Sequence, residues 1–357
     1  MRYNLQVYDR LLVHLCQWLP QERITRLRNF SLLVSGLYLS AAVHLPLIVR
    51  KWPCLGQLPS LVNRLRRFLD NTALSVRTYY RPFVQGIVQS CAGQPLRLVI
   101  DCTKVGFSYR LLTVALVYRR RTLPLAWRVY RGEKGHVTAA QVIALVTYVA
   151  TFLPAQSPVW LIGDSGFHAV EFLRWLHQRH WHFVIRQPGH VMVCWEGQPW
   201  IKLGQLPLQP GDTRPIGWVS LTHCHAYAAV WLVLHWQRGE DEPWYVVSDQ
   251  PESRTILRHY TRRMWIEEMY GDLKGHGFDL ESTHLQDPAR IARLVLGVCV
   301  VYVWFLTLGS WVVKRGYRPQ LDRKERRDKS LFRLGWDWLE HCTRLELPWR
   351  LHFKPYW

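Results

Sequence analysis

The sequence predicts an α/β protein whose core is a mixed β-sheet flanked by helices. Two observations support this prediction. Three apolar, strand-like runs follow one another at 97–101, 109–119 and 122–132, and helix-like and strand-like runs then alternate up to residue 187. The chain also has 357 residues, of which 49% are hydrophobic. It can therefore bury a large core, and disorder of the whole chain is excluded.

Residues 1–94 are expected to form an all-α domain. Apolar residues recur three and four positions apart over 3–19 and 24–39, and prolines separate these runs from a shorter amphipathic run at 61–69. The polar residues of this last run are mostly basic, which is typical of a DNA-binding face but equally of a solvated helix surface. They are Arg64, Arg66 and Arg67.

Residues 95–187 form the first part of the expected core. After the three consecutive strands, the hydrophobic pattern predicts a helix at 136–153, a strand at 159–164, a helix at 166–179 and a strand at 181–187. Three strands in a meander, followed by helices that cross over to further strands, are the order of the ribonuclease-H-like fold.

The remaining chain divides into three expected parts. Residues 188–250 contain strand-like runs separated by Pro and Gly, which indicates a β-rich insertion. Residues 251–313 complete the core with a long helix at about 252–274 and an apolar helix at 289–313. Residues 314–357 begin with many Lys and Arg and form a basic tail.

Two uncharged runs raise the question of a membrane. Residues 30–49 and 294–313 each approach the length that spans a bilayer. A helix packed against a large sheet has the same hydropathy, so the runs alone are compatible with either a membrane span or a buried core helix. The amino terminus carries early charges and lacks the apolar region of a signal peptide.

The charge of the chain indicates its partner. Lys and Arg number 46 against 26 Asp and Glu, for a net charge of +20. A folded protein this basic typically binds a polyanion such as nucleic acid, although a generally basic surface is the alternative. The eight cysteines are scattered without a C-x-x-C pair, which argues against a zinc ribbon or a disulfide framework and favours a reducing cytoplasm.

Two acids follow buried strands of the expected core. Asp101 ends the run LVID, and Asp164 ends LIGD. The carboxyl ends of strands are where α/β folds bind ligands. A single strand-end Asp commonly just caps the next turn, but two carboxylates that converge repel each other, and a divalent cation offsets that repulsion.

The helix expected at 252–274 supplies a third acid. Tyr260, Arg263, Glu267 and Lys274 are offset by three, four and seven residues, so at about 100° per residue they share one polar stripe. A solvated face with ion pairs at helical spacing explains any two of these residues, but not all four together with the two strand-end acids. Glu268 is the rival for Glu267 and lies about 100° off the stripe.

These residues resemble a known family. Y-x-x-R-x-x-x-E-x-x-x-x-x-x-K is the signature helix of bacterial insertion-sequence DDE transposases, and Tyr260, Arg263, Glu267 and Lys274 match every position. The family's first acid typically lies in an apolar-apolar-D-x-T segment, here IDCT with Asp101. Its second acid lies in a D-x-G-F or D-R-E segment, and DSGF here matches the first of these forms. The resemblance covers about 95–315.

The resemblance implies a cut-and-paste DNA transposase with a ribonuclease-H-like core. Asp101, Asp164 and Glu267 would be catalytic and would hold two Mg²⁺, for which Mn²⁺ substitutes. The implied partner is double-stranded DNA, bound at the element ends by residues 1–94 and at the target by the core, within a homodimer. Residues expected to contact DNA are Tyr260, Arg263, Lys274, Trp244, Arg186, Arg64, Arg66 and Arg67.

In family members that form a hairpin, an aromatic residue of the insertion stacks on a flipped base. The resemblance implies that Trp244 has this role here, and Trp236 is the rival candidate for it. The second acid lacks the charged D-R-E form, so strand cleavage is better supported than hairpin formation. The implied protein is bacterial, cytoplasmic and nucleoid-associated and has no membrane span, with 294–313 as a core helix. The alternative function is a DNA-binding protein that derives from a transposase and no longer transposes.

Overall fold

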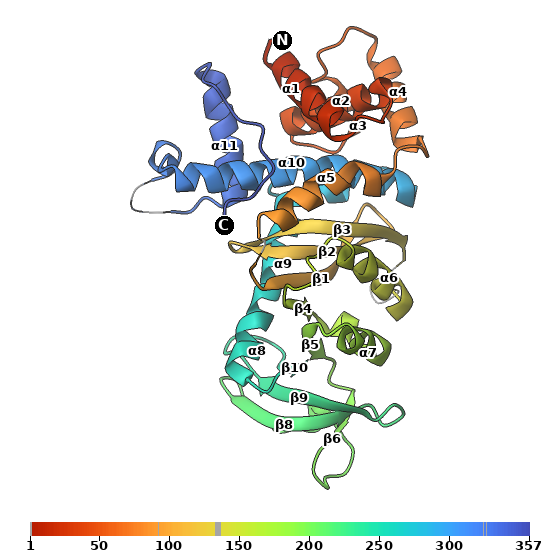
Figure 1. Ribbon diagram of the computed structural model, residues 1–357, viewed down its shortest axis with the longest axis vertical. Helices are drawn as coiled ribbons and strands as arrows, with labels where there is room; N and C mark the ends of the chain where they lie inside the picture. The colour runs from red at the N-terminus through yellow and green to blue at the C-terminus, as the bar shows by residue number, and fades with distance from the viewer. Residues whose placement is uncertain (1, 92, 133–136, 324, 326) are drawn as a thin grey trace.

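One mixed sheet of ten strands runs through the computed structural model, which describes all residues except 1, 92, 133–136, 324 and 326 (Figure 1). The strands lie side by side in the order β3-β2-β1-β4-β5-β10-β9-β8-β6-β7. Their bounds are β1 (Leu96–Val105), β2 (Tyr109–Tyr118), β3 (Arg121–Arg131), β4 (Val159–Gly163), β5 (His182–Gln187), β6 (Met192–Cys194), β7 (Ile201–Lys202), β8 (Thr213–Leu221), β9 (Tyr227–His235) and β10 (Trp244–Ser248).

The first five strands have the predicted topology. β1, β2 and β3 form an antiparallel meander, and β4 and β5 pair parallel to β1 and to each other. β2 is nearly continuously buried, and residues 98–101 of β1 are buried, as expected for strands covered on both faces. The prediction of a ribonuclease-H-like α/β core with a mixed sheet is confirmed, and the β-rich segment 188–250 continues this sheet through the antiparallel pair β5 and β10.

Helices cover both faces of the core sheet. α6 (Ala139–Ala150) and α7 (Val170–Gln178) lie on one side, and α8 (Ser253–Tyr260) and α9 (Met264–Leu273) on the other (Figure 1). A capping box between Thr138 and Gln141 starts α6. The helix is shorter than the predicted 136–153, whose first residue lies outside the described residues. Short 3₁₀ segments are η1 (Ser165–Phe167), η2 (Leu203–Gln205), η3 (Thr261–Arg263), η4 (Leu280–Ser282) and η5 (Arg318–Gln320).

The prediction of one unbroken helix over 252–274 was wrong. The 3₁₀ segment η3 separates α8 from α9. At this point the Thr261 hydroxyl donates a hydrogen bond to the Arg258 carbonyl at 3.0 Å. Hydroxyl groups that bond the backbone of the preceding turn compete with regular helix geometry.

The helix α10 (Pro288–Lys314) is the central core helix. It is the one described helix long and apolar enough to cross a membrane by length and composition, and 94% of its most apolar window is buried within the protein. It packs between the amino-terminal helices, strand β3 and the helix α11 (Leu331–Arg344) (Figure 1). The burial of this segment is that of a core helix, as expected for 294–313.

The close contact of α10 with α11 depends on glycine. A Cβ on Gly309 would lie 1.9 Å from the Leu331 carbonyl oxygen, and one on Gly335 would lie 1.9 Å from the Phe305 carbonyl oxygen. Both distances are far below van der Waals contact, so the two helix backbones can approach this closely only where neither residue has a side chain.

Five helices precede the sheet. They are α1 (Arg2–Trp18), α2 (Ile24–Ser40), α3 (Leu45–Val49), α4 (Leu58–Asp70) and α5 (Val76–Gln89). The uncharged run 30–49 is divided between α2 and α3, because α2 ends at Ala41 in a left-handed conformation. The buried Arg293 of α10 donates hydrogen bonds to the carbonyls of Leu69 at 2.8 Å and Leu74 at 3.1 Å, which ties the amino-terminal helices to the core.

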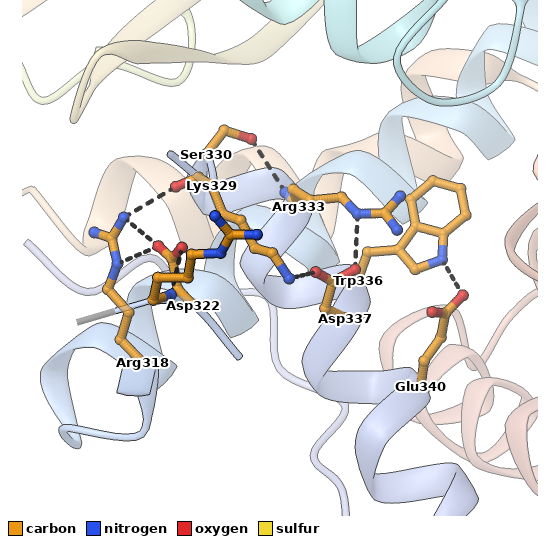
Figure 2. Close-up of polar contacts among 9 residues, drawn as sticks. Arg318, Asp322, Lys329, Ser330, Arg333, Trp336, Asp337 and Glu340 are labelled. Atoms are coloured by element: carbon orange, nitrogen blue, oxygen red, sulfur yellow. Dashed lines mark hydrogen bonds and ion pairs between the residues drawn. The ribbon is translucent and has the colours of Figure 1, made fainter. Parts of the chain in front are cut away.

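The basic tail is partly neutralised by its own acids (Figure 2). Arg318 donates two hydrogen bonds to Asp322, at 2.8 and 2.9 Å. Asp337 on α11 accepts from both Lys329 at 2.6 Å and Arg333 at 2.7 Å. Lys324 and Arg326 of this tail lie outside the described residues. The high charge of the segment therefore overstates the positive charge that its described part offers to a polyanion.

Candidate active site

The two strand-end acids lie next to each other at one end of the core sheet. β1 and β4 pair in parallel register with Ile100 opposite Gly163, so the following residues, Asp101 and Asp164, occupy adjacent positions. Asp164 directly precedes η1 and accepts a hydrogen bond from the Gly166 amide at 2.8 Å, which fixes its carboxylate at the turn. Parallel pairing thus brings together two acids that are 63 positions apart in the chain.

The carboxylate of Asp101 is strongly perturbed by its surroundings. Its residue is only 9% exposed. Burial raises the pKa of Asp101 to about 7; the negative charges of Asp164 and Glu267 also raise it, while Arg263 lowers it. Asp164 and Glu267 therefore both lie within electrostatic reach of Asp101. Perturbed carboxylates at a sheet edge are typical of functional sites.

The third acid is on α9, and the structure separates it from its neighbour. Glu267 forms an ion pair with Arg263, with 2.6 Å between the guanidinium and carboxylate atoms. Glu268 points to the β3 side, where it pairs with Arg121 at 2.9 Å. Arg121 also binds the buried Asp272 at 2.7 Å. Glu267, and not Glu268, is therefore the acid of α9 whose charge acts on Asp101.

The donor set fits a divalent cation. Asp101, Asp164 and Glu267 offer only carboxylate oxygens, which are the ligands that hard cations such as Mg²⁺ and Mn²⁺ prefer. Burial, and after it the negative charges of Asp164 and Glu267, raise the pKa of Asp101, and a bound cation would offset both effects. Among the described residues, no three His, Cys, Asp or Glu side chains are close enough to hold an ion as they stand. Glu267 would first have to exchange Arg263 for the metal.

The tyrosine of the predicted stripe joins the helix to the insertion. Tyr260 is 3% exposed and packs edge-on against Trp244, with 4.9 Å between ring centroids. Trp244 is half-buried at the start of β10 and contacts His235 on its other side. Burial raises the pKa of Tyr260, and the nearby charges of Arg263 and Arg186 oppose this effect. The structure therefore brings Trp244, Tyr260, Arg186 and Arg263 together.

Arg186 is held in place by the turn before β10. Its guanidinium donates to the Glu242 carboxylate at 2.9 Å and to the Pro243 carbonyl at 3.1 Å. The competing tryptophan, Trp236, bonds the Glu240 carbonyl at 2.9 Å instead. Within the described residues, an aromatic contact links Trp244, and none links Trp236, to the helix that carries Tyr260.

Lys274 lies just beyond the end of α9 and still reaches β1. Its ammonium group donates to the Thr103 hydroxyl at 2.8 Å and pairs with Glu281 at 2.6 Å. Thr103 follows Asp101 by two residues in the same strand, so both side chains lie on the same face of the sheet. The Lys274 ammonium group is thereby placed beside the acids.

The three arginines of α4 do not form one face. Arg64 and Arg67 line a hollow between α2 and α4, where Arg64 donates to Asn29 at 2.8 Å. Arg66 instead lines a cavity of about 620 Å³ between the amino-terminal helices and the loop that precedes α10. The rings of His44 and His284 meet in this cavity, 5.1 Å apart. These arginines are not in the set of groups around the acids.

Sequence reasoning missed two supporting residues. The buried Tyr270 donates its hydroxyl to the Asp101 backbone carbonyl at 3.0 Å, which holds β1 against α9. Its position three residues after Glu267 was a signal for it, because residues three apart share a helix face. Glu281 had no such signal, since it reaches Lys274 through the turn after α9.

A family model of known proteins matches much of the chain. The family model described as "Transposase DDE domain" matches residues 103–304, which include Asp164 and Glu267 and begin two residues after Asp101. A cryo-EM structure of the piggyBac transposase synaptic complex with hairpin DNA has a TM-score of 0.45 and 11% identity, covering 97% of this chain and 82% of that one. A comparison with curated proteins found no match. The family match covers more than half of the chain, which therefore belongs to the Transposase DDE domain family and is a DDE transposase, an enzyme that acts on DNA with divalent metal ions.

Proposed function

We propose that this protein is the cut-and-paste transposase of a bacterial insertion sequence, in the Y-R-E-K group, and that it works in the cytoplasm on nucleoid DNA. The observation that carries the proposal is that Asp164 and Glu267 both act electrostatically on the buried Asp101, beside the stripe that begins at Tyr260 and Arg263. Electrostatic repulsion among the acids and a cationic surround favour phosphoryl transfer on a polyanionic substrate.

In this proposal the three acids hold two Mg²⁺, or Mn²⁺ in their place. Bound metal would supply activation of a water or 3′-hydroxyl and stabilisation of the leaving oxygen. Asp101 is poised for this role because its burial disfavours an uncompensated negative charge. Without metal, Arg263 forms an ion pair with the Glu267 carboxylate. Once Glu267 binds metal, Arg263 would be free to bind a phosphate.

The surrounding residues would position the DNA. Lys274 lies next to Thr103 and can neutralise a phosphate near the acids. Trp244 presents a half-buried ring against Tyr260, which suits stacking on an unpaired base. Arg186 lies close to Tyr260 and would bind the adjacent backbone.

We further propose that residues 1–94 bind the terminal inverted repeats and that two copies of the chain bridge the two ends. Arg64 and Arg67 line an open hollow in this region, and neither forms an ion pair with a carboxylate of the described residues. Arg66 faces a different cavity, so it would contact a different part of the DNA. The tail that begins at residue 314 adds positive charge outside this surface.

The test is cleavage of DNA that borders the coding sequence. A labelled duplex made from that border should be cut at the element boundary by the full chain with Mg²⁺, and Asp101→Ala should abolish the cut. Full cleavage by Asp101→Ala would refute the assignment of the acids. Binding of the duplex without any cut by the unmodified chain would favour the alternative, a DNA-binding protein that no longer transposes.

A further inference from the structure

Three arginines gather where α8 and η3 pack on the sheet, at a distance from the acids. Arg97 lies at the start of β1, Arg258 on α8 and Arg262 in η3. We call these three residues the arginine cluster. Arg97 stands opposite Trp160 of β4, and His259 lies flat on the Trp160 ring with 4.3 Å between centroids. Arg262 donates to the Nδ1 atom of His259 at 3.4 Å, which joins the cluster to this stack.

The charges of the arginine cluster repel one another. Burial lowers the pKa of Arg97, and the charge of Arg258 lowers it further. Burial, Arg97 and Arg258 together lower the pKa of Arg262. The pKa of His259 falls to about 3, first through burial and then through the same three arginines, so this ring stays neutral and can accept the hydrogen bond from Arg262.

No acid offsets this charge. Within the described part of the chain, no carboxylate forms an ion pair with any member of the arginine cluster, whereas the neighbouring Arg263 pairs with one carboxylate and Arg121 with two. The Nε atom of Arg97 is buried and has no hydrogen-bond partner. A buried donor on a charged group without a partner is strongly unfavourable, so an arrangement of this kind is retained where an anion completes it.

Two members of the cluster, Arg97 and Arg262, line a small cavity. The cavity measures about 170 Å³, and Arg119, Gln94 and Trp265 also line it. A water molecule takes about 30 Å³ of liquid, so the space accommodates an oxyanion with some of its hydration. Guanidinium groups bind phosphate oxygens through paired hydrogen bonds, which matches the lining.

A DNA strand bound at the acids and running along β1 would pass the arginine cluster. Arg97 and Asp101 are four residues apart in β1, so their side chains share a face and lie about 13 Å apart along the strand at 3.3 Å per residue. Phosphates of one DNA strand advance by about 3.4 Å per base pair along the helix axis. The separation therefore corresponds to about four nucleotides from the catalytic acids.

We propose that the arginine cluster is an oxyanion site that binds one backbone phosphate of the DNA, about four nucleotides from the scissile bond. This inference rests on the proposed function, because it takes the strand to run from Asp101 along β1. Repulsion within the cluster lowers the stability of the free protein, and the bound phosphate removes that repulsion.

The first experiment measures the thermal unfolding midpoint of the full chain in inorganic phosphate and in chloride at equal ionic strength. Phosphate should raise the midpoint, and Arg97→Gln should lose most of this rise while unfolding no earlier than the unmodified chain in chloride. Arg262→Gln, at the second member of the cluster that lines the cavity, repeats the test should Arg97→Gln fold poorly. Arg344→Gln, at an exposed position on α11, is the matched control and should keep the full rise. An undiminished rise in both cluster variants would overturn the proposal.

The second experiment separates DNA phosphate from free phosphate. The affinity for a random-sequence duplex is measured at several salt concentrations. Arg97→Gln should reduce the slope of log affinity against log salt by about one and weaken binding about tenfold, and Arg344→Gln should not. A lost response to inorganic phosphate with an unchanged salt slope would overturn the assignment to DNA. The chain could show both the phosphate-dependent rise of the unfolding midpoint and the reduced salt slope of Arg97→Gln, and yet fail to cut border DNA. That result would refute the proposed function but would still support the phosphate site.

Discussion

Replacing Asp101 by Asn should make the metal-free protein more stable at neutral pH. Burial and the charges of Asp164 and Glu267 raise the pKa of Asp101 from 3.8 to about 7. The folded protein therefore holds this proton more tightly than the unfolded chain does, and its free energy of unfolding falls as the pH rises from about 4 to about 7. At 1.36 kcal/mol per pH unit, the full effect is about 4 kcal/mol.

The assay is urea unfolding in EDTA at pH 4, 6 and 8. Asp101→Asn should match the unmodified chain at pH 4 and exceed it increasingly up to pH 8, by at most about 4 kcal/mol. Asp241→Asn makes the same chemical change in an exposed loop and should show no such trend. Added Mg²⁺ or Mn²⁺ should stabilise the unmodified chain at pH 8 more than Asp101→Asn. Parallel pH profiles for Asp101→Asn and the unmodified chain would refute the reasoning.

Three further predictions follow from the contacts described above. Gly335→Ala should destabilise the chain by at least about 1–3 kcal/mol in urea, because its Cβ would overlap a backbone carbonyl of α10. Gly86→Ala, whose Cβ would make only an ordinary 3.8 Å contact with the Lys354 side chain, should be neutral or stabilising. Glu267→Gln should slow cleavage of border DNA at least about 100-fold, while Glu268→Gln should change it less than tenfold; equal losses would contradict the assignment. Trp244→Leu should weaken binding of DNA with an unpaired end base about 5- to 150-fold in a fluorescence titration, with unchanged binding of blunt duplex; equal losses on both would exclude stacking.

The strand order and the stripe were predictable because each depends on a local period. β1 and β4 read as buried strands from their apolar runs, and the acids that end them met because parallel strands end at the same edge. Tyr260, Arg263 and Glu267 share a side of the helix through the 3.6-residue repeat, which the short 3₁₀ segment η3 did not disrupt.

The partners of these side chains were not predictable from local pattern. The ion pair between Arg121 and Glu268 joins β3 to α9, although the two residues are 147 positions apart in the chain. A hydrophobic period in the sequence cannot predict a contact over that distance. The arginines of α4 were grouped by sequence proximity, yet Arg66 faces a different cavity from its neighbours. Their directions depend on how α4 packs against the rest of the protein, which only the tertiary structure shows.

The way in which the insertion joins the core limits how the protein can be shortened. β5 is paired on both sides, by β4 and by β10, and β10 comes from the insertion. Removing residues 188–250 would leave β5 as a bare edge strand, with exposed amide and carbonyl groups that favour association between chains. A truncated core is therefore expected to aggregate unless a charged or proline-bearing strand is supplied to cover that edge.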